Sequence, residues 1–147
     1  MVLDLKRINF DDCVEQGLLR RIPSSVSVAE SSLRASERWL LEAETGLSSG
    51  ALNSSVMSSY LAMFHSSRAV LYRDGYREKS HYCIARYLEE KYVKTGKLEA
   101  RWVDLLDHAR ERRHESQYDV VFITSKQEAE QSLRTARDFV DRLKRLF

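Results

Sequence analysis

NSSVMSSYLAMFHSSRAVLYRD, residues 53–74, is the stretch that decides the fold. It contains no proline or glycine, and its apolar side chains recur along one broad side of a helix. These side chains are Val56, Met57, Tyr60, Leu61, Met63, Phe64, Val70 and Leu71. The face is wider than a narrow seam between two helices. We therefore expect the most buried helix of the protein here, with Asn53 as its N-cap and Gly75 as its end.

Helical patterns continue on both sides of this stretch. Upstream, Ser27-Val28-Ala29-Glu30 has the form of a capping box, and apolar or small residues follow it at helical spacing as far as Leu47. Downstream, further helices are expected at about residues 79–95, 98–115 and 125–147, the last opening with the capping box Ser125-Lys126-Gln127-Glu128. The one proline and five glycines all lie between these segments.

These patterns predict an all-α protein in which no strand is needed. Because the connections are about three to nine residues long, neighbouring helices should pack antiparallel. We expect one domain over residues 1–147: an up-and-down antiparallel four-helix bundle at 24–147, preceded by an accessory segment at 1–23 with a short extra helix over 11–21. Residues 116–124 should cover the bundle end as a loop through Val120, Val121, Phe122 and Ile123, a short edge strand being the weaker alternative.

Composition excludes several classes of protein. A chain of 147 residues with 43% hydrophobic and 31% charged residues is typical of a single soluble domain. It has no run apolar enough to cross a membrane, and its N-terminus lacks the apolar core of a signal peptide. The two cysteines, Cys13 and Cys83, make neither a disulfide framework nor a CxxC zinc motif, so we expect a cytoplasmic protein. The net charge of +2 is too small to indicate nucleic-acid binding unless the charges are clustered.

The densest cationic cluster is ARERRH, residues 109–114. Positive side chains near the end of a helix complement its dipole, which is the structural explanation of the cluster. Arg113, however, follows Leu106 by seven residues and so continues the apolar stripe inward, with Arg110 on its flank. An inward guanidinium needs either an internal carboxylate or an anionic group such as a phosphate. His114 is rotated about 100° from Arg113 on an ideal helix, so both cannot point into one core.

The other histidines lie in different settings. His65 is within the most apolar helix, where a hydrogen-bonded core imidazole is a more frequent explanation than a catalytic one. His81 follows Lys79 at the opening of a helix and could line the same bundle end. His108 lies on a polar face and should be solvated. Because these imidazoles have no matched acidic ligands, we expect no metal site, and no other motif indicates a cofactor.

Several motifs together resemble a known family. They are the YxAMFHxxxAxL core at 60–71, Lys79-Ser80-His81, the ARxxR passage around Arg110 and Arg113 with the later Tyr118-Asp119, and DDCVEQGLLRRIPSS at 11–25. These segments resemble the HEPN domain family, small helical bundles of bacteria and archaea, over nearly the whole chain. The N-terminal pattern is similar to that of the stand-alone members.

The resemblance implies a homodimer that is often encoded beside a minimal nucleotidyltransferase as a toxin and antitoxin pair. Many members of the family are metal-independent ribonucleases. Their motif is an arginine, four to six residues and a histidine, contributed by both protomers to one cleft. In such a site the arginine stabilises charge on the scissile phosphate, while the histidine moves the proton of the ribose 2'-hydroxyl or of the leaving oxygen.

This chain departs from that motif. The motif would require an arginine at position 107, 108 or 109 for His114 to be its histidine, but these positions hold Asp107, His108 and Ala109. Arg113 has the required spacing to Tyr118, but a tyrosine is a poor general base at neutral pH, although it can donate a proton or a hydrogen bond. The family also has a tyrosine just beyond the motif that can receive a nucleotidyl group from the partner enzyme, and the offset of Tyr118 is not the usual one.

Three functional hypotheses follow. The first is a nucleotide- or RNA-binding protein that is the accessory or toxin partner of a nucleotidyltransferase; the second is a metal-independent endoribonuclease toxin. The third is a structural dimer in which Arg113 pairs with an internal acid such as Asp119 and Tyr118 forms a hydrogen bond within the core. The phosphate-binding candidates are Arg110, Arg113, His65, His81 and Lys79, and the catalytic candidates are Arg113, Tyr118 and His114.

Overall fold

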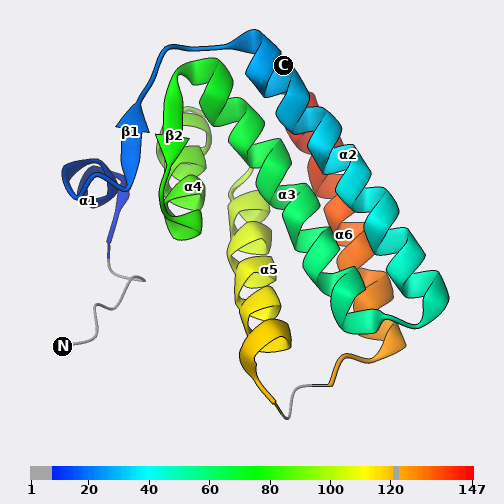
Figure 1. Ribbon diagram of the computed structural model, residues 1–147. Coiled ribbons are helices and arrows are strands. Elements are labelled where there is room, and N and C mark those ends of the chain that lie inside the picture. The colour runs from blue at the N-terminus through cyan, green and yellow to red at the C-terminus, as the bar shows by residue number, and fades with distance from the viewer. Residues whose placement is uncertain (1–7, 121–122) are drawn as a thin grey trace.

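The computed structural model describes residues 8–120 and 123–147, which form a bundle of helices (Figure 1). In chain order the elements are α1 (Phe10–Glu15), β1 (Leu19–Arg21), α2 (Val26–Ser49), α3 (Leu52–Asp74), β2 (Tyr76–Glu78), α4 (His81–Leu88), the π-helical segment η2 (Glu89–Val93), α5 (Ala100–Tyr118) and α6 (Lys126–Lys144). The long helices α2, α3, α5 and α6 run alternately in opposite directions along the bundle (Figure 1). The predicted all-α class is confirmed.

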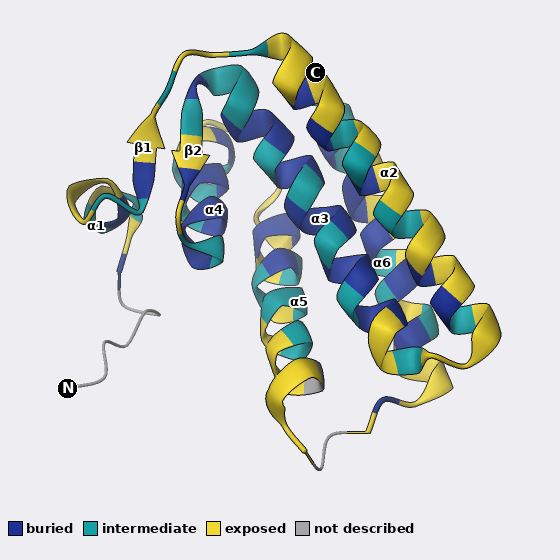
Figure 2. Ribbon diagram, viewed as in Figure 1, coloured by how far each residue is buried: buried dark blue, intermediate teal, exposed yellow. Residues whose placement is uncertain are grey.

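Helix α3 is the centre of the bundle, since it packs against α2, α4, α5 and α6. Buried residues cover most of its surface (Figure 2), which confirms residues 53–74 as the most buried helix. The predicted cap is wrong: the N-cap residue is Ala51, without a side-chain hydrogen bond, and Asn53 lies inside the first turn. The reason is the tight reversal after α2. Gly50 adopts a left-handed conformation and the Ala51 amide bonds to the Gly46 carbonyl, so α3 can begin at once.

Small residues let α2 and α3 approach closely. The buried residues of α2 are Ala29, Ser32, Ser36, Ala43 and Gly46. A Cβ atom at Gly46 would lie 3.2 Å from the Ala51 carbonyl oxygen and from the Ser55 amide nitrogen. The buried hydroxyls of Ser32 and Ser55 donate across the interface to the carbonyls of His65 and Ala43, both at 2.7 Å. This hairpin is therefore held by close packing and satisfied hydroxyls.

The start of α2 also differs from the prediction. Its N-cap is Ser25, whose hydroxyl accepts from the Val28 amide at 3.2 Å. Ser25 has the extended backbone that a cap requires, so the predicted box at Ser27 lies inside the first turn. At α6 the predicted N-cap Ser125 is confirmed, because its hydroxyl accepts from the Glu128 amide at 3.1 Å.

The expectation of no strand is wrong at one place. Strands β1 and β2 pair antiparallel, with Leu19 opposite Glu78 and Arg21 opposite Tyr76. The helix predicted over 11–21 covers only Phe10–Glu15, because Gly17 at φ 73° turns the chain out of it. Each strand has three residues. Strands this short show no alternating pattern, and their pairing depends on a partner far away in the chain.

The loop after α5 is more exposed than predicted. Helix α5 continues to Tyr118, beyond the predicted end. Val120 is 99% exposed and Ile123 is 86% exposed, so these two residues do not cover the bundle end. Val121 and Phe122, predicted to do the same, lie outside the described residues.

A disulfide joins the N-terminal segment to the bundle. Cys13 of α1 and Cys83 of α4 are bonded and fully buried, with Cα atoms 5.9 Å apart and a sequence separation of 70. The Tyr82 hydroxyl also donates to the Ile8 carbonyl at 3.2 Å. This bond was not foreseen from the sequence, and because of it the cysteines no longer support the expected cytoplasmic location. The bond fixes α1 to α4 covalently.

Candidate functional site

Five of the side chains that could carry chemistry meet where α3, α4 and α5 adjoin. We call them the Arg–His site: Tyr60, Phe64, His81, Arg110 and Arg113. The imidazole of His81 stacks on Phe64 with ring centroids 4.1 Å apart, and the Tyr60 hydroxyl lies 2.9 Å from His81 Nδ1. The Arg113 guanidinium lies over the Tyr60 ring, 5.2 Å from its centroid.

Local structure explains this convergence. Tyr60 and Phe64 are one turn apart on α3 and so present their rings on the same side. His81 is the first residue of α4, which the short β2 strand returns alongside α3. On α5, Arg110 and Arg113 are three residues apart: Arg113 lies over the Tyr60 ring, and Arg110 lies over the ring of Tyr82 on α4, 5.0 Å from its centroid.

Carboxylates form ion pairs with three of the arginines around the site. Arg110 bonds to Asp107 at 2.6 Å, and Arg86 bonds to the other oxygen of the same carboxylate at 2.6 Å. Arg68 pairs with the buried Glu78 at 2.8 Å. Each of these guanidinium groups therefore has a carboxylate partner, and Arg86 and Arg110 share one.

Arg113 is different. Its NH1 group donates to the side-chain oxygen of Gln117 at 3.1 Å, and its Nε atom is buried. Within residues 8–120 and 123–147, that Nε has no hydrogen-bond partner and no carboxylate forms an ion pair with Arg113. The expected alternative of a pair with Asp119 is not found there. Arg113 thus faces the site as a cation without a counter-charge.

The imidazole of His81 is neutral at physiological pH. Burial, together with the nearby charges of Arg113, Arg68 and Arg110, lowers the pKa of His81 from 6.5 to about 4. Burial also raises the pKa of Tyr60, so its hydroxyl stays protonated. The Tyr60 hydroxyl and His81 Nδ1 therefore share a hydrogen bond in which the imidazole tautomer decides the donor. In the tautomer that accepts from Tyr60, the imidazole proton is on Nε2. His81 can offer one N–H to a ligand.

The structure separates the other candidate residues. His114 and Tyr118 contact each other, with ring centroids 4.8 Å apart, at the exposed end of α5. His65 is half-buried and packs edge-on against Phe64, and burial, then Arg68, lowers its pKa. Lys79 is exposed beside the start of α4. His108 is exposed, as its polar face indicates.

Several residues of the site were not identified from sequence. Tyr60 and Phe64 stood in the family motif but were read as core. Asp107 lies three residues before Arg110, a helical ion-pair spacing that could have indicated it. The spacing of Arg113 and Gln117, four residues, could likewise have suggested their contact.

Neither a metal centre nor a membrane span is found in the part of the chain that the structure describes. Histidine, cysteine, aspartate and glutamate residues there do not gather in groups of three or more that could hold a metal ion. The helices of that part are too short or too polar to cross a bilayer.

Comparison with known proteins gives two matches. The model of the HEPN domain matches residues 29–146, a range that contains every residue of the Arg–His site. A curated protein of Methanocaldococcus jannaschii, which carries the name "putative toxin", is 25% identical over 126 residues. The similarity covers 86% of this chain and 81% of that protein.

Proposed function

The chain belongs to the HEPN domain family, and on that premise we propose that it binds RNA by its phosphate backbone at the Arg–His site. The observation that carries the proposal is the Arg113 guanidinium, which faces the site without a carboxylate partner among the described residues. A guanidinium has a planar fork of donors that matches two oxygens of a phosphate. The phosphate would supply the missing counter-charge.

Neighbouring groups favour the same ligand. The Nε2–H of neutral His81 can donate to a phosphate oxygen, and Arg110 is next to Arg113 on the same flank of α5. The Arg113 guanidinium, which after burial has the largest effect on the pKa of His81, would attract an anion for the same electrostatic reason. The site thus combines one cation without a carboxylate partner among the described residues and one neutral donor.

The same geometry favours binding over cleavage. A general base should have a pKa near the working pH, whereas the pKa of His81 is lowered to about 4 and its Nδ1 is already hydrogen-bonded to Tyr60. His114 contacts Tyr118, while Arg113 contacts Tyr60 and Gln117. We therefore place RNA binding before metal-independent RNA cleavage, which remains the competing function.

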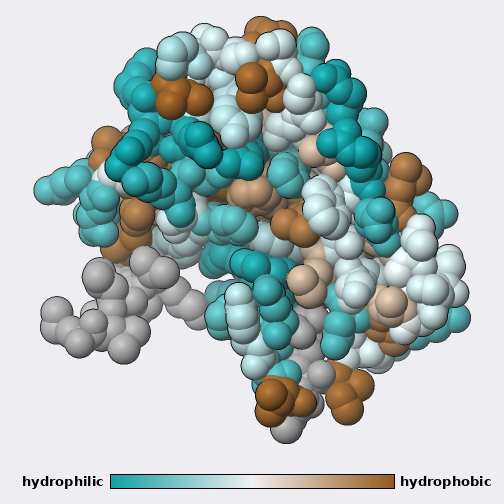
Figure 3. Space-filling model, viewed as in Figure 1, coloured by the Kyte–Doolittle hydropathy of each residue, from teal (hydrophilic) through white to brown (hydrophobic). Residues whose placement is uncertain are grey.

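For partners, we propose a homodimer that acts in the cytoplasm as the toxin-side component beside a nucleotidyltransferase. The relative named "putative toxin" supports the toxin side, and the family resemblance supports the nucleotidyltransferase. Tyr118, Val120 and Ile123 are large apolar side chains exposed at the end of α5 and in the loop after it. Hydrophobic residues stand out at this tip in Figure 3. Such a patch is suited to contact with a second copy.

Fluorescence anisotropy with a labelled single-stranded RNA of 20 nucleotides tests the binding function. We expect Arg113→Gln to weaken binding about tenfold. The slope of the logarithm of the binding constant against the logarithm of the salt concentration should become shallower by about one, as expected for the loss of one phosphate contact. Arg34→Gln is the matched control, because it removes the same charge from an exposed position on α2. Equal affinities of wild type and Arg113→Gln would overturn the proposal.

Incubation of the protein with a mixed cellular RNA pool in chelator tests the competing function. Intact RNA with wild type supports binding without cleavage. Defined fragments produced by wild type and absent with Arg113→Ala would instead establish a metal-independent ribonuclease, and binding alone would no longer describe the function.

A further inference from the structure

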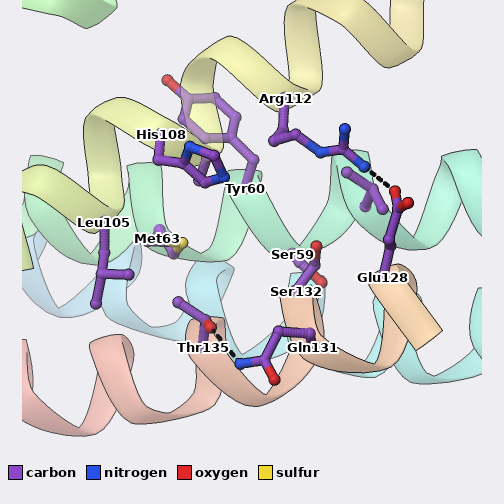
Figure 4. A pocket seen from close by; sticks show the side chains of 12 residues that line it. Ser59, Tyr60, Met63, Leu105, His108, Arg112, Glu128, Gln131, Ser132 and Thr135 are labelled. Carbon is purple, nitrogen blue, oxygen red and sulfur yellow. Dashed lines mark hydrogen bonds and ion pairs between the residues drawn. The ribbon is translucent and has the colours of Figure 1, made fainter. Parts of the chain in front are cut away.

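A cavity lies on the other flank of α5, between α3, α5 and α6 (Figure 4). Leu105, Ala109 and Arg112 of α5 line it, whereas Arg110 and Arg113 of the same helix face the Arg–His site. Its volume of about 400 Å³ is within the range of small-molecule sites in proteins. The cavity is thus distinct from the proposed RNA site, although the Tyr60 ring contributes to both.

The lining of the cavity indicates an uncharged ligand. Val56, Tyr60 and Met63 of α3 lie opposite Leu105 and Ala109, so the interior is mainly apolar. The charged residues of the lining are Arg112 and Glu128, which form an ion pair with each other (Figure 4). An ion placed inside would be desolvated without an available opposite charge, which is costly.

Ser59 gives the cavity one unsatisfied polar group. The residue is 1% exposed, and among the described residues its hydroxyl has no hydrogen-bond partner. By contrast, the buried hydroxyls of Ser55, Ser66 and Ser67 on the same helix each donate to a backbone carbonyl at 2.7 to 2.9 Å. A buried hydroxyl without a partner is uncommon. Its position in the cavity lining points to a polar atom of a ligand.

We infer that this cavity binds an uncharged, mainly apolar aromatic molecule with one hydrogen-bonding group directed at Ser59. The aromatic preference follows from Tyr60 and Met63, since a phenol ring and a thioether both pack favourably against an aromatic ring. Gln131, Ser132 and Thr135 on α6, with His108 on α5, complete the lining and can contact the polar edge of the ligand.

Indole is the probe, because it is planar, uncharged and carries one N–H donor. The chain has three methionines, so labelling their methyl groups with carbon-13 gives a simple spectrum. Met63 lines the cavity, while Met57, six residues earlier on α3, does not. We expect indole, titrated to about 5 mM, to shift the Met63 methyl signal saturably and leave that of Met57 in place. No saturable shift of Met63 would overturn the inference.

Variants test the position and the chemistry of the site. Ala109→Leu fills the cavity and should weaken indole binding at least tenfold, whereas Ala100→Leu, the same change at an exposed position of α5, should leave it unchanged. Ser59→Ala should weaken binding about fivefold, as expected for one lost hydrogen bond, and it introduces no bulk that could prevent folding. Indole-3-acetate should bind at least tenfold more weakly than indole. Equal binding of the two molecules, or unchanged binding by both Ala109→Leu and Ser59→Ala, would contradict the inference.

Discussion

The α2–α3 hairpin and the face formed by α4 and α5 are built in opposite ways. In the hairpin, small residues bring two helices together, and the hydroxyls of Ser32 and Ser55 are satisfied by backbone carbonyls. On the other face, guanidinium groups, carboxylates and aromatic rings meet, and the second half of α5 is largely exposed (Figure 2). The first region has little room for change, while the second keeps a charge unbalanced at Arg113. This contrast separates what stabilises the protein from what can bind a ligand.

The disulfide should produce the largest effect, because it holds the N-terminal segment to α4. Replacing Cys13 and Cys83 together by alanine should lower the free energy of unfolding by about 4 kcal/mol, as expected for a crosslink that spans 70 residues. Urea denaturation of the variant and of the oxidised wild type measures the difference. A loss below about 1 kcal/mol would show that packing alone holds this segment.

Overpacking the hairpin should have the next largest effect. Gly46→Val places branched carbons against the backbone of Ala51 and Ser55 and should cost about 3 kcal/mol. Ser48→Val, an exposed position on the same helix, is the control and should change stability by less than about 0.5 kcal/mol. RNA binding by the folded fraction of Gly46→Val should be unaltered. A matching loss of RNA affinity would mean that the two regions are coupled.

Much of the contrast between the regions could be predicted from the sequence. The burial of α3 follows from its apolar pattern, which depends only on neighbouring residues. The seven-residue step from Leu106 to Arg113 also indicated the inner flank of α5, where Arg113 lies over Tyr60. In a long helix the apolar spacing repeats over several turns, so the buried face can be identified from the sequence alone.

The remaining features depend on contacts between distant parts of the chain. The bond from Tyr60 to His81 joins residues 21 positions apart and exists only because β2 returns the chain beside α3. The β1–β2 pairing and the disulfide likewise join segments more than 50 residues apart. The spacing of residues along one helix gives no information about such contacts. Individual residues of the Arg–His site could therefore be proposed from the sequence, but their contacts with one another could not.

The dependence of protein stability on pH tests the contribution of His81 in the Arg–His site. The pKa of His81 is lowered to about 4 in the folded state, so the unfolded chain takes up a proton first as the pH falls below 6.5. The stability contributed by neutral His81 is present above pH 6.5 and is lost between pH 6.5 and 4. We expect a loss of about 2 kcal/mol, less than the roughly 3.4 kcal/mol that such a pKa shift gives for a fully buried group, because the side chain is partly solvated. His65, whose pKa is also lowered, contributes in the same direction.

The variant His81→Asn isolates this effect, because an asparagine oxygen can accept from Tyr60 but does not titrate. Urea denaturation at several pH values should show a shallower loss of stability for His81→Asn than for wild type. His108→Asn, an exposed position on α5, should follow the wild-type curve. Parallel curves for wild type and His81→Asn would mean that His81 titrates normally in the folded protein.

The smallest change in stability should come with an opposite change in binding. Asp107 holds both Arg86 and Arg110, so Asp107→Asn leaves two partly buried cations without their carboxylate. We expect stability to fall by about 1 to 2 kcal/mol, a modest loss because the three side chains are partly solvated. Arg110, released beside Arg113, should raise RNA affinity several-fold, as measured by anisotropy, while Asp104→Asn should change neither quantity. If the Asp107 variant bound RNA more weakly, the carboxylate would be ordering the site rather than neutralising it, and charge balance would no longer explain why Arg113 differs from Arg110.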